Sequence, residues 1–402
     1  MYIKRELERK IKPFLLREEI IAVVGPRRAG KTTLLQKIYE EWHGEKEFLT
    51  FEDFSILQLF ESNPKEFINK YVKNKSLLCI DEFQYAKNGG KILKYIYDTE
   101  KIKVFISGSS AIDLTIQALG KLTGRVLIFE LYPLNFSEFL QLKDPDLNVL
   151  LNKIRKNREL ILERDEHSRF KKAYGEFTRF GGYPQVVLSP TEDEKRSLLN
   201  SIYSTYFLRE VRDMIDIVDD RKLAHLIRII ALQNGGLLNY SELCKMSGIS
   251  FETLKRYLRF LEQTYIIKIV LPFHKNRQLE LIKTPKFYFL DTGLLNAILD
   301  DFRSMEVRED KGTLLENTVF GEFVKEGKAV QFWRTKEKLE LDFIVGEGNR
   351  KFRAFEVKYK EQTLTSGFYS FQNLYRNVPV QMLYFESEKP EINNLSLPAY
   401  LL

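Results

Sequence analysis

Runs of apolar residues alternate with amphipathic stretches along roughly the first 140 residues of the chain. Short, nearly continuous apolar segments bounded by turns are typical of buried parallel strands, whereas the stretches between them, such as residues 33–42, have helical spacing. The expected strands cover residues 20–25, 47–53, 76–82, 103–107 and 125–131. This alternation predicts an α/β fold with a doubly wound parallel sheet.

The middle of the chain is expected to be helical. Charged residues recur at helical spacing between positions 152 and 172, which predicts a solvated connecting helix. Gly181-Gly-Tyr-Pro184 has the composition of a turn, and further helical segments are expected from 193 to 233. Residues 151–235 are therefore interpreted as a helical connector that follows a first domain of residues 1–150.

Residues 236–300 have a different organisation, which predicts a separate small domain. The expected elements are an extended piece at 238–240, helices at 241–246 and 250–265, and extended runs at 266–273 and 279–282. Ser250 is placed to cap the second helix. Two helices joined by a tight turn and followed by a hairpin are the layout of a winged helix.

Basic residues on this predicted winged helix suit contacts with nucleic acid phosphates. The candidates are Lys255, Arg259, Lys275 and Arg277. The same helix also carries Glu252 and Glu262, and no dense basic patch is apparent. DNA binding and a purely structural or protein-contacting winged helix are therefore both open alternatives.

A GxxxxGK[ST] pattern lies directly between the first expected strand and the helix that follows it. Its residues are Gly25, Pro26, Arg27, Arg28, Ala29, Gly30, Lys31 and Thr32, followed by Thr33. Glycines let the backbone N–H groups turn inward around phosphate, the lysine reaches the β- and γ-phosphates, and the threonine hydroxyl ligates Mg²⁺. A strand, a glycine-rich turn and a helix in this order predict an ATP site formed by residues 25–33.

A second element of the expected nucleotide site is the carboxylate pair Asp81 and Glu82, which ends a buried strand. Asp81 is expected to hold the Mg²⁺ shell, and Glu82 to orient and deprotonate the attacking water. Ser107 or Ser109, after the next strand, is a candidate hydrogen-bond donor to the γ-phosphate or the water. Arg125 is a candidate source of positive charge for the transition state, with an ordinary surface arginine as the alternative.

The last hundred residues contain a third group of candidate functional residues. Two strand-like runs, 339–345 and 352–359, flank a turn, so that Asp342 is expected opposite Glu356 with Lys358 on the same face as Glu356. Glu316, on an amphipathic helix upstream, is expected to join them. Carboxylates so arranged can share Mg²⁺ while Lys358 activates water against a phosphodiester, so the pattern favours a nuclease site or a non-cleaving version of one.

Composition narrows the remaining possibilities. With 402 residues, 44% of them hydrophobic, the chain is expected to form two or three globular domains. Two cysteines without disulfide or zinc spacing favour a reducing cytoplasm, and no apolar run approaches the roughly 20 residues of a membrane span. The net charge of +7 permits binding to nucleic acid without requiring it.

Together these motifs resemble prokaryotic, often archaeal, AAA-type ATPases that carry a winged helix and a C-terminal restriction-endonuclease-like PD-(D/E)xK domain. The residues that carry the resemblance are Gly25 to Thr32, Cys79 to Glu82, Ser107 to Ser110, Gly124-Arg125, Gly181 to Pro184, Phe289 to Gly293, Glu316, Asp342, Glu356 and Lys358. The resemblance implies ATP binding and hydrolysis with Mg²⁺, and a nuclease-like domain at 301–402.

Two classes of function are consistent with this organisation. In the first, ATP hydrolysis drives rearrangement of the winged helix and the nuclease-like domain on DNA. In the second, the nucleotide state controls assembly with a protein partner, and the C-terminal domain is an inactive platform. A homo-oligomer is compatible with either class, with Arg125 acting on its own nucleotide or on a neighbour's.

Overall fold

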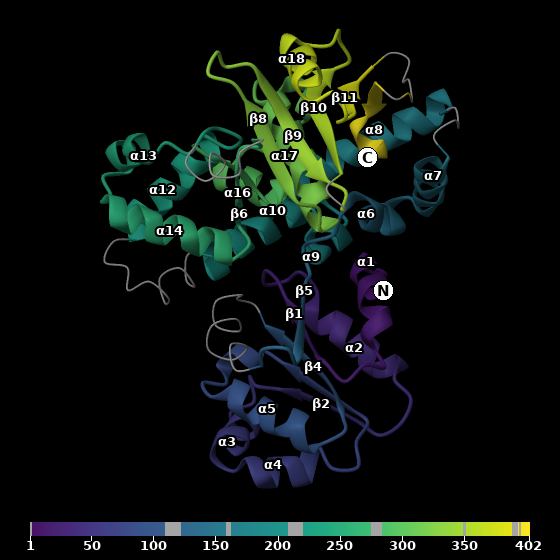
Figure 1. The fold of residues 1–402 in the computed structure, drawn as a ribbon, viewed down its shortest axis with the longest axis vertical. Helices are drawn as coiled ribbons and strands as arrows, with labels where there is room; N and C mark the ends of the chain where they lie inside the picture. Colours follow the sequence, from purple (N-terminus) through teal and green to yellow (C-terminus); the bar gives the residue numbers. More distant parts are fainter. Residues whose placement is uncertain are drawn as a thin grey trace. The chain divides into compact units, whose positions relative to one another are not determined.

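The computed structural model describes residues 2–108, 122–157, 162–207, 220–274, 284–348, 351–387, 393 and 395–402. The chain divides into two compact units (Figure 1). The first unit comprises Met1–Pro133 with Gln263–Tyr265, and the second comprises Leu134–Glu262 with Ile266–Leu402.

The first unit is built on a parallel sheet, as the sequence predicts. Its strands are β1 (Ile20–Val24), β2 (Lys46–Thr50), β3 (Leu77–Asp81), β4 (Lys103–Gly108) and β5 (Val126–Glu130). They lie in the order β2-β3-β4-β1-β5, and every neighbouring pair is parallel. Since β4 lies between β1 and β3, the carboxyl ends of these three strands meet at one edge of the sheet.

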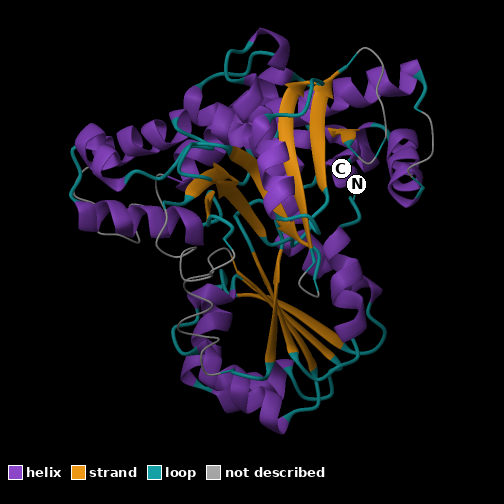
Figure 2. Ribbon diagram, turned by 45° about the horizontal axis from the view of Figure 1, so that its top comes forward, coloured by secondary structure: helices purple, strands orange, loops and turns teal. Residues whose placement is uncertain are grey.

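Helices lie on both faces of this sheet, which confirms the expected α/β layering (Figure 2). They are α1 (Glu6–Ile11), η1 (Lys12–Phe14), α2 (Lys31–Glu41), α3 (Phe54–Ser62), α4 (Pro64–Tyr71), η2 (Phe83–Tyr85) and α5 (Gly89–Thr99). One core cluster joins Leu7 and Ile11 of α1 to Leu34 and Leu35 of α2 and to the side chains of the strands. This burial of apolar surface fixes α1 and α2 on the sheet.

The second unit begins with a helical region. Its helices up to residue 232 are α6 (Phe136–Lys143), α7 (Pro145–Lys156), α8 (Arg164–Phe180), α9 (Pro184–Leu188), α10 (Glu192–Ser201), the π-helical turn Ile202–Phe207 and α12 (Asp220–Leu232). The single solvated helix expected at 152–172 is wrong, because α7 ends at Lys156 and α8 begins at Arg164. His167, Phe170 and Tyr174 of α8 are buried, so this helix packs rather than only connecting.

The next part of the second unit contains α13 (Tyr240–Ser247), α14 (Phe251–Gln263) and the antiparallel strands β6 (Ile267–Val270) and β7 (Lys286–Phe289). The Ser250 hydroxyl accepts the amide hydrogen of Thr253 at 3.3 Å, as a cap of α14 should. The expected second hairpin strand at 279–282, with Lys275 and Arg277, lies outside the described residues. The strand that pairs with β6 among the described residues is β7.

The remaining elements form a mixed sheet with the order β12-β11-β10-β9-β8 (Figure 1). Its strands and helices are α16 (Thr292–Leu299), η6 (Met305–Val307), α17 (Lys311–Lys325), β8 (Val330–Arg334), β9 (Glu340–Gly346), β10 (Phe352–Lys360), α18 (Ser366–Leu374), β11 (Val380–Glu386), β12 (Ser396–Pro398) and η7 (Ala399–Leu401). Phe320 and Phe323 of α17 pack against Phe343 of β9. In the described part of the chain, no helix has the length and apolar character needed to cross a membrane.

Candidate functional site

The glycine-rich loop between β1 and α2 has the backbone conformation that its sequence suggests. Gly25 has φ +152° and Gly30 has φ +97°, both in the region that favours glycine. A Cβ atom on Gly25 would lie 2.1 Å from the carbonyl oxygen of Leu131, so the loop begins in direct backbone contact with the residue that follows β5. Glycine is required at this position both for its φ angle and for this close approach.

Lys31 is buried at the start of α2, with 5% of its surface exposed. Its ammonium donates hydrogen bonds to the carbonyl oxygens of Gly25 at 3.0 Å and Pro26 at 2.8 Å. Burial lowers the pKa of Lys31 to about 8, although the nearby Glu82 and Asp81 carboxylates oppose this effect. The loop therefore folds around a cation that a phosphate group can contact.

Asp81, at the end of β3, lies next to Thr32. The Thr32 hydroxyl donates a hydrogen bond of 2.7 Å to Asp81 Oδ2, and the hydroxyl of Ser107 on β4 donates to Asp81 Oδ1. The hydroxyl of Thr32 and the carboxylate of Asp81 form the kind of oxygen ligand pair that Mg²⁺ prefers. The residues present thus fit a magnesium ion bound beside the loop.

Glu82 follows directly and has an unusual backbone. Its φ of +54° is in the left-handed region, which costs a residue other than glycine about 1–2 kcal/mol. Its carboxylate accepts a hydrogen bond from the side-chain amide of Gln84. Strained residues that their surroundings hold in place are concentrated at functional sites, and Glu82 lies next to the Asp81–Thr32 pair.

Arg125 is not brought to this site within the same chain. It precedes β5, its carbonyl accepts the amide hydrogen of Ile20, and its side chain pairs with Asp98 at 2.8 Å. Because β1 and β5 are parallel and Ile20 begins β1, Arg125 lies at the amino edge of the sheet, whereas the loop lies at the carboxyl edge. The transition-state role suggested for Arg125 is therefore wrong for its own nucleotide. Ser109 lies outside the described residues.

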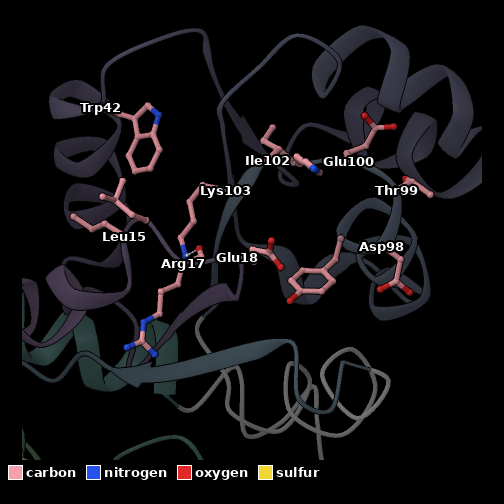
Figure 3. A pocket seen from close by; sticks show the side chains of 12 residues that line it. Leu15, Arg17, Glu18, Trp42, Asp98, Thr99, Glu100, Ile102 and Lys103 are labelled. Carbon is pink, nitrogen blue, oxygen red and sulfur yellow. Dashed lines mark hydrogen bonds between the residues drawn. The ribbon is translucent and has the colours of Figure 1, made fainter.

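A cavity of about 440 Å³ is also found at this amino edge (Figure 3). Lys103 in its lining donates hydrogen bonds to the carbonyl oxygens of Phe14, Arg17 and Glu19. Burial lowers the pKa of Lys103 to about 8, and its three donors are engaged by these backbone acceptors. This cavity is separate from the glycine-rich loop, and the hydrogen bonds of Lys103 hold the start of β4 beside it.

The second unit contains a buried cluster of charges around Lys286 of β7. Lys286 forms ion pairs with Glu340 and, at 3.5 Å, with Glu316, whose carboxylate also accepts the hydroxyl hydrogen of Tyr288. Burial, and next the charge of Glu316, raise the pKa of the neighbouring Asp342 to about 7, while Lys286 and Lys358 oppose the rise. Lys286 was not anticipated, because it belongs to none of the recognised motifs.

The strand pairing runs from Gly346↔Phe352 to Phe343↔Phe355, so the next position of this register places Asp342 opposite Glu356. Asp342 Oδ2 accepts the amide hydrogen of Val357 at 2.7 Å. Glu356 pairs with Lys358 at 3.1 Å and accepts the hydroxyl hydrogen of Thr365. Burial lowers the pKa of Lys358, but the Asp342 and Glu356 charges outweigh it and raise that pKa.

No group of three or more His, Cys, Asp or Glu side chains is arranged to hold a metal ion in the ranges of the chain that the structure describes. These ranges include Glu316, Asp342 and Glu356. Each of the three carboxylates is engaged by protein groups: Glu316 by Tyr288 and Lys286, Asp342 by the Val357 amide, and Glu356 by Lys358 and Thr365. The expected single set of three metal ligands is not assembled in this arrangement.

Comparison with known proteins separates the chain into three regions. Residues 17–140 match a family model described as an AAA domain, and residues 171–304 and 311–400 match two models described as domains of unknown function, DUF8612 and DUF4143. The AAA match, together with the parallel sheet and the glycine-rich loop, supports an AAA-type ATPase.

Similar proteins that match most of this chain occur in an archaeon and a bacterium. An uncharacterized protein of Methanocaldococcus jannaschii is 28% identical over a match that covers 87% of this chain and 76% of that protein. An uncharacterized protein of Haemophilus influenzae is 25% identical over a match that covers 91% of this chain and 90% of that protein. Two solved structures also align. The ORC2 protein of Aeropyrum pernix is 13% identical, with 76% of this chain and 96% of that chain covered and a TM-score of 0.36. The Holliday junction branch migration motor RuvB of Thermotoga maritima is 16% identical, with 66% of this chain and 89% of that chain covered and a TM-score of 0.33. TM-scores this low carry no inference about this chain.

Proposed function

We propose that the first unit binds ATP together with Mg²⁺ and hydrolyses it. The observation that best supports this proposal is the 2.7 Å hydrogen bond between Thr32 and Asp81, directly beside the buried ammonium of Lys31. A hydroxyl, a carboxylate and a lysine at the carboxyl edge of a parallel sheet are the groups that hold a nucleoside triphosphate and its metal ion.

Each residue of the proposed site has a distinct role. Lys31 binds the β- and γ-phosphates, and the N–H groups of residues 28–32 surround them. Thr32 and Asp81 hold Mg²⁺, which neutralises phosphate charge when bound, and Ser107 orients Asp81 through its hydrogen bond. Glu82 orients the attacking water and takes its proton.

Two substitutions test these roles separately. Lys31→Ala should weaken binding of Mg-ATP, because the phosphate charge loses its buried partner. Glu82→Gln should leave binding largely intact and abolish turnover, because the amide cannot accept the proton of the water. Equilibrium binding and steady-state phosphate release measure the two effects, with Lys91→Ala, an exposed lysine on α5, as control. Normal turnover by Glu82→Gln would contradict the assignment.

The finer proposal is that ATP hydrolysis acts on DNA. It assigns residues 1–150 to the ATPase domain, 151–235 to a helical connector, 236–300 to a winged helix and 301–402 to a nuclease-like domain. The capped helix α14 supports it, because Lys255, Arg256 and Arg259 are exposed on this helix. Basic side chains on the second helix of such a module contact DNA phosphates.

A second candidate is an ATPase whose nucleotide state controls binding of a protein partner, with a non-cleaving C-terminal domain. The observation that favours it is the ammonium of Lys286, which pairs with Glu316 and Glu340 beside Asp342. The ammonium of Lys286 neutralises part of the carboxylate charge that a bound Mg²⁺ ion would otherwise neutralise. The test is metal-dependent DNA cleavage by the wild type and by Asp342→Ala. If the wild type cleaves DNA and Asp342→Ala does not, while ATP hydrolysis is unchanged, this second candidate is rejected and the nuclease is supported.

A further inference from the structure

Arg5, near the start of the chain, lies close to the glycine-rich loop although it belongs to no motif. It is 7% exposed and precedes α1. Its Nη1 donates a hydrogen bond of 2.8 Å to the carbonyl oxygen of Ala29, and its Nη2 donates one of 2.6 Å to that of Tyr132. One guanidinium thus bridges the loop and the segment that follows β5.

The backbone of Arg5 is held firmly in this position. Its amide donates a 2.6 Å hydrogen bond to the carboxylate of Glu8, which also accepts the hydroxyl hydrogen of Tyr2. Leu7 and Ile11 of α1 are buried in the core cluster of the first unit. The guanidinium therefore belongs to the residue that directly precedes a helix fixed on the sheet.

The contact with Ala29 bears on phosphate binding through peptide geometry. In a planar trans peptide the C=O and the following N–H point in opposite directions. By holding the Ala29 carbonyl, Arg5 turns the N–H of Gly30 to the other side of that peptide. In loops of this kind, such N–H groups surround the phosphate. Arg5 also adds a positive charge behind the loop.

The contact with Tyr132 links the same loop to the second unit through the chain itself. Leu131 donates its amide hydrogen to Val24 at 2.8 Å, and its carbonyl lies against Gly25. A phosphate bound to Lys31 would compete for the ammonium that now bonds to the Gly25 and Pro26 carbonyls. A change at Gly25 would therefore reach Leu131 directly, and Tyr132 as the next residue along the chain.

The residues after Pro133 are anchored just as tightly within the second unit. The Leu134 amide donates to the Gly182 carbonyl at 2.7 Å, and the Leu134 carbonyl accepts from Lys325 Nζ at 3.0 Å. The Phe136 amide donates to the buried carboxylate of Glu322 at 2.9 Å. Only Pro133 separates Tyr132, held by Arg5, from Leu134.

We propose that Arg5 is a positioning residue of the nucleotide site, and that its bridge between Ala29 and Tyr132 transmits occupation of the loop to the anchored segment Leu134–Phe136. The inference rests on the proposed ATP site and deepens it by naming how nucleotide binding reaches the second unit.

The test uses Arg5→Lys in the full-length protein, with Arg9→Ala, an exposed arginine of α1, as the matched control. A lysine offers one nitrogen in place of the two Nη atoms that bond the Ala29 and Tyr132 carbonyls, so it cannot reproduce the planar fork of the guanidinium. We expect Arg5→Lys to bind the non-hydrolysable analogue adenylyl imidodiphosphate about tenfold more weakly, with KM for ATP raised more than kcat is lowered. Arg5→Gln, which keeps one donor, serves if the lysine variant does not fold.

The second readout is hydrogen exchange at the Leu134 and Phe136 amides. In the wild type, the analogue should change their exchange rates, and in Arg5→Lys saturated with the analogue this change should be lost. If Arg5 had a purely structural role, its substitution would lower only the stability of the fold. The inference would be overturned if Arg5→Lys bound the analogue within twofold of the wild-type affinity and kept the exchange response. If the wild type does not bind the analogue, the ATP site and this inference both fail. If all variants bind and respond alike, only the inference fails.

Discussion

At the scale of single residues, Lys31 carries a positive charge that its burial disfavours. Burial lowers its pKa to about 8, far below the ordinary lysine value of about 10.4. A bound phosphate favours the charged form. The affinity for nucleotide should therefore be highest well below pH 8 and should decrease as the pH rises through 8.

This pH dependence can be measured. Linkage of one proton predicts that affinity for Mg-ADP decreases about tenfold between pH 7 and 9, since the free protein must take up a proton to bind. Binding titrations across this range test it, with Lys31→Ala as the control that should show a flat profile. Lys103 titrates in the same range but is bonded to backbone carbonyls at the other edge of the sheet. The same slope in Lys31→Ala would contradict the role of Lys31.

At the residue scale, the sequence predicted the loop and the Asp81–Glu82 pair, because their spacing is set by phosphate chemistry. It did not reveal Arg5 or Lys286. A single basic residue carries no spacing signal, and both act through partners far away in the chain, such as Tyr132 for Arg5 and Glu340 for Lys286. Arg125 does not reach the nucleotide site of its own chain, because it directly precedes the parallel strand β5 and therefore lies at the amino edge of the sheet.

At the scale of elements, strands were easier to predict than helices. Completely buried strands such as β3 are continuous apolar runs, so their limits were found to within one or two residues. The charged stretch at 152–172 was misleading, because its many charges obscured His167, Phe170 and Tyr174, whose spacing marks a buried helical face. Periodicity was the better guide there than charge density.

Strand β7 depends on Lys286 in a way that can be tested. The substitution Lys286→Met removes the cation shared by three carboxylates, those of Glu316, Glu340 and Asp342. Removing one partner of a buried ion cluster lowers the free energy of unfolding by about 3–5 kcal/mol. The ion pair of the exposed Arg303 with the half-buried Asp301 is the control, and Arg303→Met should cost less than about 1 kcal/mol.

The two tryptophans of the chain make this measurement specific. Trp42 belongs to the first unit and Trp333 to β8 in the second. Urea unfolding followed by the fluorescence of Trp333, in a Trp42→Phe background, therefore reports on the second unit. A cost of Lys286→Met no larger than that of the control would mean that the charges of the cluster are well hydrated.

At the scale of the whole molecule, the two proposed functions differ in what the proposed ATP hydrolysis controls. If the chain acts on DNA, its steady-state rate should increase several-fold when one form of single-stranded, duplex or branched DNA is added in low salt, where phosphate contacts are strongest. Lys255→Glu combined with Arg259→Glu should remove the stimulation and leave the basal rate unchanged. A rate that no DNA form alters would favour the protein-regulated ATPase.

Hydrolysis of ATP by the purified 402-residue chain tests the central claim most directly. Phosphate release from Mg-ATP should be measured for the wild type and Glu82→Gln, together with nucleotide binding by both. The account predicts turnover only in the wild type and comparable binding by the two proteins. Equal turnover by both, or no binding of nucleotide by the wild type, would contradict it.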